Sequence, residues 1–526
     1  MEQLKEINLF HKDNMQLRKC FFFFFVMAVC GYLALIVSFC PYSDDYCRHI
    51  ANFHVGTMSG QRHATFILEL IMYLSNVITD AAPFTNIISC GFLAYSAIFC
   101  LRMFKVNLDN KLEILCFVPI VINPFLFEAM MYRFDNPFMT LALLLAAISA
   151  YFSSLCRKKY FILQTIPLLI SFFMYQAAFG LYFTVLAYNF IMEIQSGTSI
   201  SKAISKMRYW FFTLLFVGLF YLPFTYFLTY CVSHDGGMFL IPYNAENIEK
   251  IIENIARYFS SMYSDWSLNT VGNIFFCVLA IFMANILIQT WNNTKSVISI
   301  GASFLGIFAF LLAPSGLYIF LRVVAFEGNV LIMPRIIYSM GMLISIVLFN
   351  NCRLFKQIRI SHIFYGCLVS VFCLWNVVFL NSAANVVNYY RILQRHVSYD
   401  IAKDIFSITN DNENIKEVCI TGSVETQAMT NFVKLYPIIE KMIPELWNIP
   451  DYARISLMSS NFAKQVLQFI PITKEYAESD YSNKRLIKKH MWYDVFLLDE
   501  HLLLVALKSE KNKHQPSSVA IAKIRE

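Results

Sequence analysis

The sequence contains little charge. Only 15% of its 526 residues are Asp, Glu, Lys or Arg, whereas about a quarter of the residues of a soluble domain are charged. Hydrophobic residues make up 58% of the chain, and the mean hydropathy is +0.54. Apolar runs of about 20 residues recur, and that length lets a helix cross about 30 Å of hydrocarbon. The composition therefore predicts a polytopic, mainly α-helical membrane bundle.

Several chemical signatures are also absent. The sequence has no GxxxxGK[ST], GxGxxG, HExxH or GxSxG segment, which argues against nucleotide-driven pumping by this chain alone. Its 14 cysteines are scattered and form no CxxC pair, so they indicate no metal or redox site. The formal net charge of +7 is typical of a membrane protein with basic cytoplasmic loops. We therefore predict no nucleic-acid partner.

Basic residues set the expected topology. Lys5, Lys12, Arg18 and Lys19 precede the first apolar run, which places the N-terminus in the cytoplasm by the positive-inside rule. The same rule makes residues 62–80 a helix in the outer interface rather than a span. About eleven spans are then expected, near residues 20–40, 83–101, 112–128, 137–155, two within 160–194, 209–230, 271–291, 297–313, from 334, and 360–380.

The composition changes near Asn385. Residues 386–526 contain 35 charged residues in 141, against 42 in the 385 before them. We therefore expect a membrane domain over residues 1–384 and a soluble α/β domain over 385–526, on the outer side after eleven spans. Expected elements of the second domain are a helix with Leu393, Val397, Ile401 and Ile405 on one face, a strand at 418–421, and a hairpin of 494–498 with 502–507.

Asp44 and Asp45 follow the first predicted span directly. Charge at that depth is costly and is usually functional. If the protein transfers a sugar from a lipid phosphate, one carboxylate takes the proton of the acceptor hydroxyl, and Asp44 is our preferred base. The other carboxylate then orients the acceptor or binds a metal, so a divalent cation is a candidate cofactor. The alternative is that Ser43 or Asp44 caps the next helix.

A second polar segment is Tyr132-Arg133-Phe134-Asp135-Asn136-Pro137. Arg133 and Asp135 suit an ion pair at the outer face, and Asp135 is a further candidate catalytic or metal-binding carboxylate. The alternative interpretation is the start of a helix, with Pro137 in its first turn and an acidic or amide cap.

Cations at the outer face are needed to bind a lipid phosphate. Arg62, Arg133 and Arg335 are the candidates, because a guanidinium binds phosphate through two parallel hydrogen bonds. The alternative for each arginine is contact with bulk lipid headgroups. Tyr175 and Gln176 lie at a predicted outer turn, where they bind a sugar or satisfy the turn itself.

The order of these segments resembles a known family. Asp44-Asp45-Tyr46, Gln61-Arg62, Tyr132–Met139 and Tyr175-Gln176-Ala177 are similar to segments of the Gtr-type serotype-converting O-antigen glucosyltransferases, type II branch. The Tyr-Arg-Phe-Asp segment is the most specific of them, and the resemblance covers roughly the membrane half of the chain.

The resemblance implies a GT-C-like fold with its active site at the periplasmic face of a bacterial inner membrane. It implies undecaprenyl-phosphate glucose as donor, lipid-linked O-antigen as acceptor, membrane lipid around the bundle, and a separate flippase and donor-synthesising enzyme. The alternatives are a flippase or transporter of a lipid-linked sugar, another polyprenyl-phosphate-sugar transferase, or an O-antigen polymerase. A transporter would predict internal repeats, and none is evident in the sequence.

Overall fold

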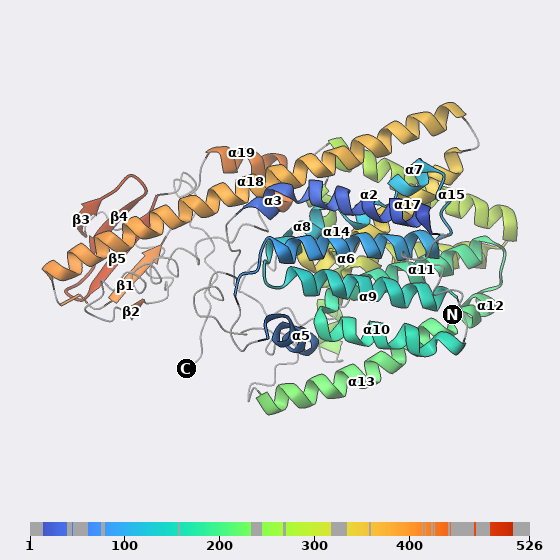
Figure 1. The fold of residues 1–526 in the computed structure, drawn as a ribbon, viewed down its shortest axis with the longest axis horizontal. Coiled ribbons are helices and arrows are strands. Elements are labelled where there is room, and N and C mark those ends of the chain that lie inside the picture. Colours follow the sequence, from blue (N-terminus) through green and yellow to red (C-terminus); the bar gives the residue numbers. More distant parts are fainter. Residues whose placement is uncertain are drawn as a thin grey trace. The chain divides into compact units, whose positions relative to one another are not determined.

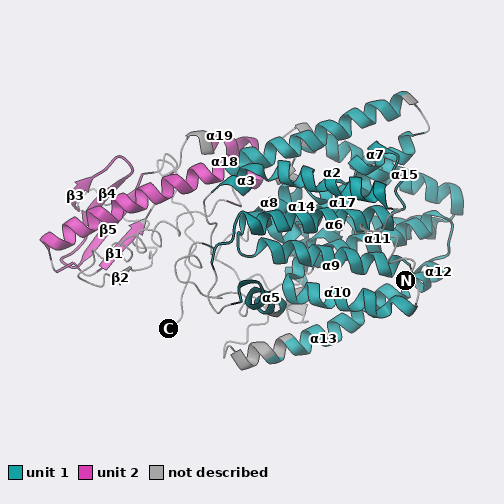
Figure 2. Ribbon diagram, in the orientation of Figure 1, with its two compact units in different colours: residues 1–322, 332–384 teal, residues 323–331, 385–526 magenta. Residues whose placement is uncertain are grey.

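The computed structural model describes residues 14–38, 45, 62–74, 79–155, 158–232, 245–266, 270–316, 334–356, 359–412, 414–415, 417–421, 424, 427–439, 442, 468–469 and 484–508 (Figure 1). The chain forms two compact units (Figure 2). Unit 1 comprises Met1–Arg322 with Ile332–Ala384, and unit 2 comprises Val323–Leu331 with Asn385–Glu526.

Unit 1 is built from helices. Its α-helices are α2 (Met15–Gly31), α3 (Leu33–Val37), α5 (His63–Tyr73), α6 (Phe84–Met103), α7 (Lys111–Leu115), α8 (Pro124–Met131), α9 (Asn136–Ser154), α10 (Phe161–Met174), α11 (Phe179–Gln195), α12 (Ile200–Lys206), α13 (Arg208–Val232), α14 (Ala245–Trp266), α15 (Thr270–Thr294), α16 (Val297–Leu312) and α17 (Met340–Phe355). Short 3-10 helices are η1 (Val118–Ile120), η2 (Lys158–Tyr160), η3 (Gln176–Ala178), η4 (Ala313–Ser315) and η6 (Pro334–Ile337).

Several of these helices can cross a membrane. Among the described residues, six are long and apolar enough, or eight if each of two bent helix pairs is one span. The predicted count of about eleven is therefore not confirmed. One physical reason is length, since α2, α10 and α17 have 17, 14 and 16 residues and a straight span needs about 20.

The centre of unit 1 is a layer of three helices. α9 packs between α6 and α10, and most of its surface is buried, with the small residues Ala142, Ala146 and Ala150 fully so. Small side chains allow membrane helices to approach closely. Ser171 of α10 donates to the carbonyl oxygen of Ala142 at 2.8 Å, and this contact ties the two helices together. The layer thus holds the adjacent ends of α9 and α10 in fixed positions.

Helix α18 (Arg359–Asp411) contains 53 residues and runs from unit 1 into unit 2. The sequence predicted two helices here, a span at 360–380 and an amphipathic helix that includes Leu393. No glycine or proline lies between residues 381 and 411, so nothing local interrupts the backbone. The change in composition near Asn385 therefore falls within one continuous helix.

Unit 2 is a small sheet covered by the end of α18. Its strands are β1 (Glu417–Thr421), β2 (Gln468–Phe469), β3 (Arg485–Lys489), β4 (Tyr493–Leu497) and β5 (Leu502–Leu507), in the order β2-β1-β5-β4-β3. The unit also contains α19 (Gln427–Leu435) and η7 (Pro437–Ile439). β1 is parallel to β2 and β5, whereas β4 is antiparallel to β3 and β5. The predicted strand and hairpin are both confirmed.

The predicted helix face forms the core of unit 2. Val397, Ile401 and Ile405 of α18 are fully buried and pack with Val418 and Val505 of the sheet. Asp404 adds a polar contact on the same helix. Its carboxylate accepts a hydrogen bond from the Tyr493 hydroxyl at 2.7 Å and pairs with Lys488 at 2.5 Å. Burial and this neighbouring carboxylate raise the pKa of Tyr493, so its hydroxyl remains protonated and able to donate.

Replacement of Asp404 by Ala is expected to destabilise unit 2 by about 1–3 kcal/mol, because it leaves the buried Tyr493 hydroxyl without its acceptor. The measurement is the urea dependence of proteolysis of the full chain within residues 385–526. Asp400→Ala is the matched control, since Asp400 is half-exposed and its ion pair with His490 is long, at 3.9 Å. Equal sensitivity of the two variants would contradict the assigned role of Asp404.

Candidate active site

The loop between α8 and α9 carries the Tyr-Arg-Phe-Asp segment. The buried Asn136 fixes this loop, because its amide donates to the carbonyl oxygen of Met130 at 3.2 Å and its side-chain oxygen accepts from Ser89 at 3.0 Å. Pro137 follows in the first turn of α9, where its missing N–H is not needed. The polar residues of the loop are thereby held in place.

Asp45 and Arg133 meet at this loop. The buried Asp45 carboxylate accepts the backbone N–H of Arg133 at 2.5 Å. The Arg133 guanidinium pairs with Asp80 at 3.0 Å and donates to the carbonyl oxygen of Ser38, after α3, also at 3.0 Å. The structure thus brings Asp45 and Arg133 together and adds Asp80, which the sequence did not identify. Asp44 lies outside the described residues.

Asp135 forms an ion pair with Arg62. Their closest atoms, Oδ2 and a terminal guanidinium nitrogen, are 3.1 Å apart. Asp135 occupies the cap position of α9, but its side chain makes no capping hydrogen bond, so the capping alternative for this side chain is wrong. The Arg62 guanidinium also lies over the Tyr175 ring, 4.9 Å from its centre. Residues far apart in the sequence therefore converge on one cation.

Arg335 forms a second pair, with Glu128 of α8. The Arg335 guanidinium lies 3.4 Å from Glu128 Oε1, and its backbone N–H donates to Oε2 at 2.9 Å. The same guanidinium lies over the Tyr132 ring at 4.7 Å. The carbonyl oxygen of Arg335 accepts from the Tyr175 hydroxyl at 3.3 Å. Tyr175 therefore links the Arg62 pair to the Arg335 pair.

Gln176 is turned toward a different helix. Its side-chain amide donates to the Tyr221 hydroxyl of α13 at 2.8 Å. Of the two residues at the predicted outer turn, Tyr175 thus belongs to the polar cluster, whereas Gln176 satisfies the packing of α10 and η3 against α13. This contact is made to α13 and not within the turn, and sugar binding by Gln176 stays a prediction.

These contacts define what we call the arginine–carboxylate cluster, which consists of Arg62, Arg133, Arg335, Asp45, Asp80, Glu128 and Asp135. Its three arginines differ in exposure. The side chains of Arg62 and Arg335 are 21% and 19% exposed, whereas that of Arg133 is 7% exposed. Arg62 and Arg335 can therefore contact an anionic ligand, while Arg133 positions the loop.

Asp80 and Glu128 were not among the predicted site residues. Glu128 ends a predicted apolar span, and an acidic residue in such a run is a functional candidate by default. Asp80 lies in the stretch predicted to be one interfacial helix, whereas α5 ends at Tyr73. Both carboxylates could have been noted from hydropathy alone. Their arginine partners could not, because they are distant in the chain.

Metal binding was one hypothesis for the carboxylates. Within the described part of the chain, no three His, Cys, Asp or Glu side chains are grouped so that they could hold a metal ion. Asp80, Glu128 and Asp135 each face an arginine instead. The described carboxylates thus suit the neutralisation of arginine charge, and a divalent cation remains a prediction.

Comparisons with known proteins agree with the membrane half of the chain. A family model described as Glucosyl transferase GtrII matches residues 33–349, a range that contains the whole arginine–carboxylate cluster. A protein of Salmonella phage P22, described as an uncharacterized 55.3 kDa protein in the gtrB 5' region, is 27% identical over 223 residues. That match covers 41% of this chain and 44% of the phage protein. No solved structure matches the chain.

Proposed function

The chain belongs to the GtrII glucosyltransferase family and is a glycosyltransferase, and we propose that it transfers glucose from undecaprenyl-phosphate glucose to a sugar hydroxyl of lipid-linked O-antigen. The family implies O-antigen glucosylation with a lipid-linked donor and a polysaccharide acceptor. The proposed function includes serotype conversion, because glucosylation changes the O-antigen that the bacterium displays. A separate enzyme makes the donor and a separate flippase moves it to the outer side.

The proposed location is the bacterial inner membrane, with a GT-C-like membrane domain over residues 1–384. The basic residues near the starts of α2 and α7 support a cytoplasmic N-terminus by the positive-inside rule. The arginine–carboxylate cluster then faces the periplasm, together with the domain at residues 385–526. A periplasmic site suits an acceptor that is assembled on lipid before export.

The observation that carries the proposal is the pairing of Arg62 with Asp135 beside the Asp45-anchored loop. In the proposed reaction, the acceptor hydroxyl oxygen attacks the anomeric carbon, and the bond from that carbon to the phosphate oxygen breaks with inversion. Asp44 receives the hydroxyl proton. Asp45, whose carboxylate is fixed by the Arg133 N–H, orients the acceptor.

The departing phosphate leaves with the bonding electron pair and gains negative charge. Arg62 and Arg335 are the partly exposed cations of the cluster, and we assign them to this phosphate. Because its charge grows toward the transition state, their effect is larger on kcat than on substrate binding. Tyr175, which contacts both arginine pairs, sets their spacing.

Reconstitution tests the proposal. The full chain in liposomes, given polyprenyl-phosphate glucose and lipid-linked O-antigen repeats, is expected to form a covalent glucosyl product that mass spectrometry detects. Movement of the donor across the bilayer without transfer would show a flippase and overturn the proposal. Parallel assays with polyprenyl-phosphate galactose test the donor, and transfer of galactose alone would overturn the glucose assignment while leaving the transferase class intact.

A further inference from the structure

A groove opens at the end of unit 1 where basic residues gather. Its cavity has a volume of about 670 Å³ and lies between α2, α7, the loop before α7, and the first part of α18. Contacts tie these elements together at that end, since Gln16 of α2 donates to Asp109 at 2.6 Å and Arg353 of α17 donates to the carbonyl oxygen of Lys105 at 3.3 Å. The groove shares no residue with the arginine–carboxylate cluster.

The lining changes from polar to apolar with depth. Gln16 and Lys19 belong to the first turns of α2, and Phe23 lies one turn further along the same face. Gly366 and Ser370 of α18 lie roughly 10 and 16 Å along that helix from its start. One end of the groove is therefore polar, and its interior is lined by aromatic and aliphatic groups.

The polar end carries two lysines that no described residue neutralises through an ion pair. Lys19 and Lys111 are exposed and line the groove, and neither forms an ion pair with a described residue. Asp109 also lines the groove, where it accepts from Gln16. The lining thus contains two cations and one anion.

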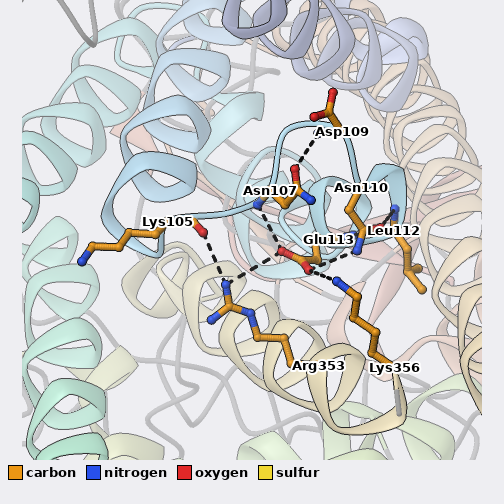
Figure 3. Close-up of polar contacts among 8 residues, drawn as sticks. All are labelled: Lys105, Asn107, Asp109, Asn110, Leu112, Glu113, Arg353 and Lys356. Atoms are coloured by element: carbon orange, nitrogen blue, oxygen red, sulfur yellow. Dashed lines mark hydrogen bonds and ion pairs between the residues drawn. The ribbon is translucent and has the colours of Figure 1, made fainter. Parts of the chain in front are cut away.

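The neighbouring carboxylate, Glu113, is already paired and does not oppose an anion in the groove. It accepts from the Asn107 backbone and the Asn110 side chain at 3.2 and 3.0 Å. Arg353, near the end of α17, and Lys356, just after it, approach Glu113 at 3.9 and 3.7 Å. Figure 3 shows Glu113 between the loop that contains Asn107 and Asn110 and the basic side chains of Arg353 and Lys356.

Gly366 lines the apolar part of the groove. A Cβ at this position would lie 3.5 Å from a methyl carbon of Leu112 on the opposite wall, which is ordinary van der Waals contact. A Cβ is therefore tolerated at position 366, and a larger side chain there would occupy space in the groove. This provides a way to fill the apolar part and leave the lysines unchanged.

We propose that this groove is a binding site for one anionic phospholipid, with its acyl chains against Phe23, Leu112 and Leu115 and its headgroup phosphate between Lys19 and Lys111. Charge complementarity at the polar end and the apolar interior together select an amphiphile with a negative head. The site is independent of the proposed sugar transfer. It anchors the end of unit 1 that lies opposite the arginine–carboxylate cluster.

Native mass spectrometry of the delipidated full chain tests the site, with phosphatidylglycerol and phosphatidylcholine of identical acyl chains as probes. We expect the first phosphatidylglycerol to bind at least about tenfold more tightly than phosphatidylcholine. The double variant Lys19→Gln/Lys111→Gln loses this preference. Gly366→Leu weakens the binding of both lipids.

Two matched controls accompany these variants. Lys105→Gln/Lys202→Gln removes the same charge from exposed positions that do not line the groove, and Gly301→Leu adds the same side chain to a helical glycine with open space around it. Both controls are expected to keep the preference and the affinity. The melting temperature of each variant in detergent shows that it is folded.

Three results would overturn the proposal. Equal binding of the two lipids by the unmodified chain would remove the role of the lysines. Loss of the preference in the control double variant would show a diffuse effect of net charge. A dimer that binds no phosphatidylglycerol and that Gly366→Leu converts to a monomer would show that a second copy of the chain covers the groove.

Discussion

Asn in place of Asp44 or Asp45 is expected to reduce O-antigen glucosylation at least about 100-fold, the lower range of what a general base contributes. Asp44→Asn removes the proposed base and lowers kcat. In the unmodified chain the Arg133 nitrogen lies 2.5 Å from the Asp45 carboxylate. Asp45→Asn keeps an oxygen that accepts this N–H, so the loop keeps its fold while the negative charge is lost. Because Asp45 orients the acceptor, this variant also raises the KM of the acceptor.

The measurement is glucosylation of O-antigen in a host whose O-antigen is otherwise unmodified, with the amount of membrane protein followed by immunoblot. Asp109→Asn is the matched control, because Asp109 is an exposed carboxylate in the loop before α7 whose contact with Gln16 needs only an oxygen acceptor. Full glucosylation by both Asp44→Asn and Asp45→Asn at normal protein amounts would defeat the assignment of the acidic pair.

Arg62→Ala is expected to lower kcat by about 100-fold or more, with a smaller change in the KM of the donor. The reason is that a fixed cation stabilises charge that develops on the leaving phosphate. Arg62 is 21% exposed, and its one carboxylate partner among the described residues is Asp135. Arg62→Lys keeps the charge but not the planar pair of donors, so it recovers only part of the rate.

A double variant separates two roles of Arg62. If Arg62 served only to neutralise Asp135, then Asp135→Asn would restore activity to Arg62→Ala. If Arg62 contacts the phosphate, the double variant stays far less active than Asp135→Asn alone, and this is the outcome we expect. Arg257→Ala is the control, since Arg257 is an exposed arginine that pairs with Glu253 on the same helix, α14. Single-turnover rates with the purified chain provide the measurement, and recovery in the double variant would limit Arg62 to a structural role.

The local parts of the fold were predictable because they depend on short-range patterns. The face formed by Val397, Ile401 and Ile405 is buried as its four-residue spacing predicts. The hairpin of β4 and β5 follows from two apolar runs around Asp499, whose side chain accepts from the backbone of the turn at 2.8 and 2.9 Å. Both features depend only on neighbours within the same element or turn.

The number of membrane spans did not follow from the sequence, because hydropathy does not report where a helix bends or ends. The stretch predicted as the span at 112–128 is a bent pair, with α7 and η1 inclined by 50° to α8. Pro119 lies in the first turn of η1 and Pro124 in the first turn of α8. These prolines explain the break between the two helices. The predicted boundary near Asn385 instead lies inside α18.

By itself, the sequence determined that this is a helical membrane protein with polar segments at Asp44-Asp45 and Tyr132–Pro137, because apolar length and local motifs are properties of consecutive residues. Only the tertiary structure decided the partners. It pairs Arg133 with Asp80, Arg62 with Asp135 and Arg335 with Glu128, across 53, 73 and 207 positions of the chain. Such pairs depend on how α5, α8 and η6 pack, since a buried charge is stabilised by an opposite charge or by hydrogen bonds close to it, and no local pattern specifies which partner it meets.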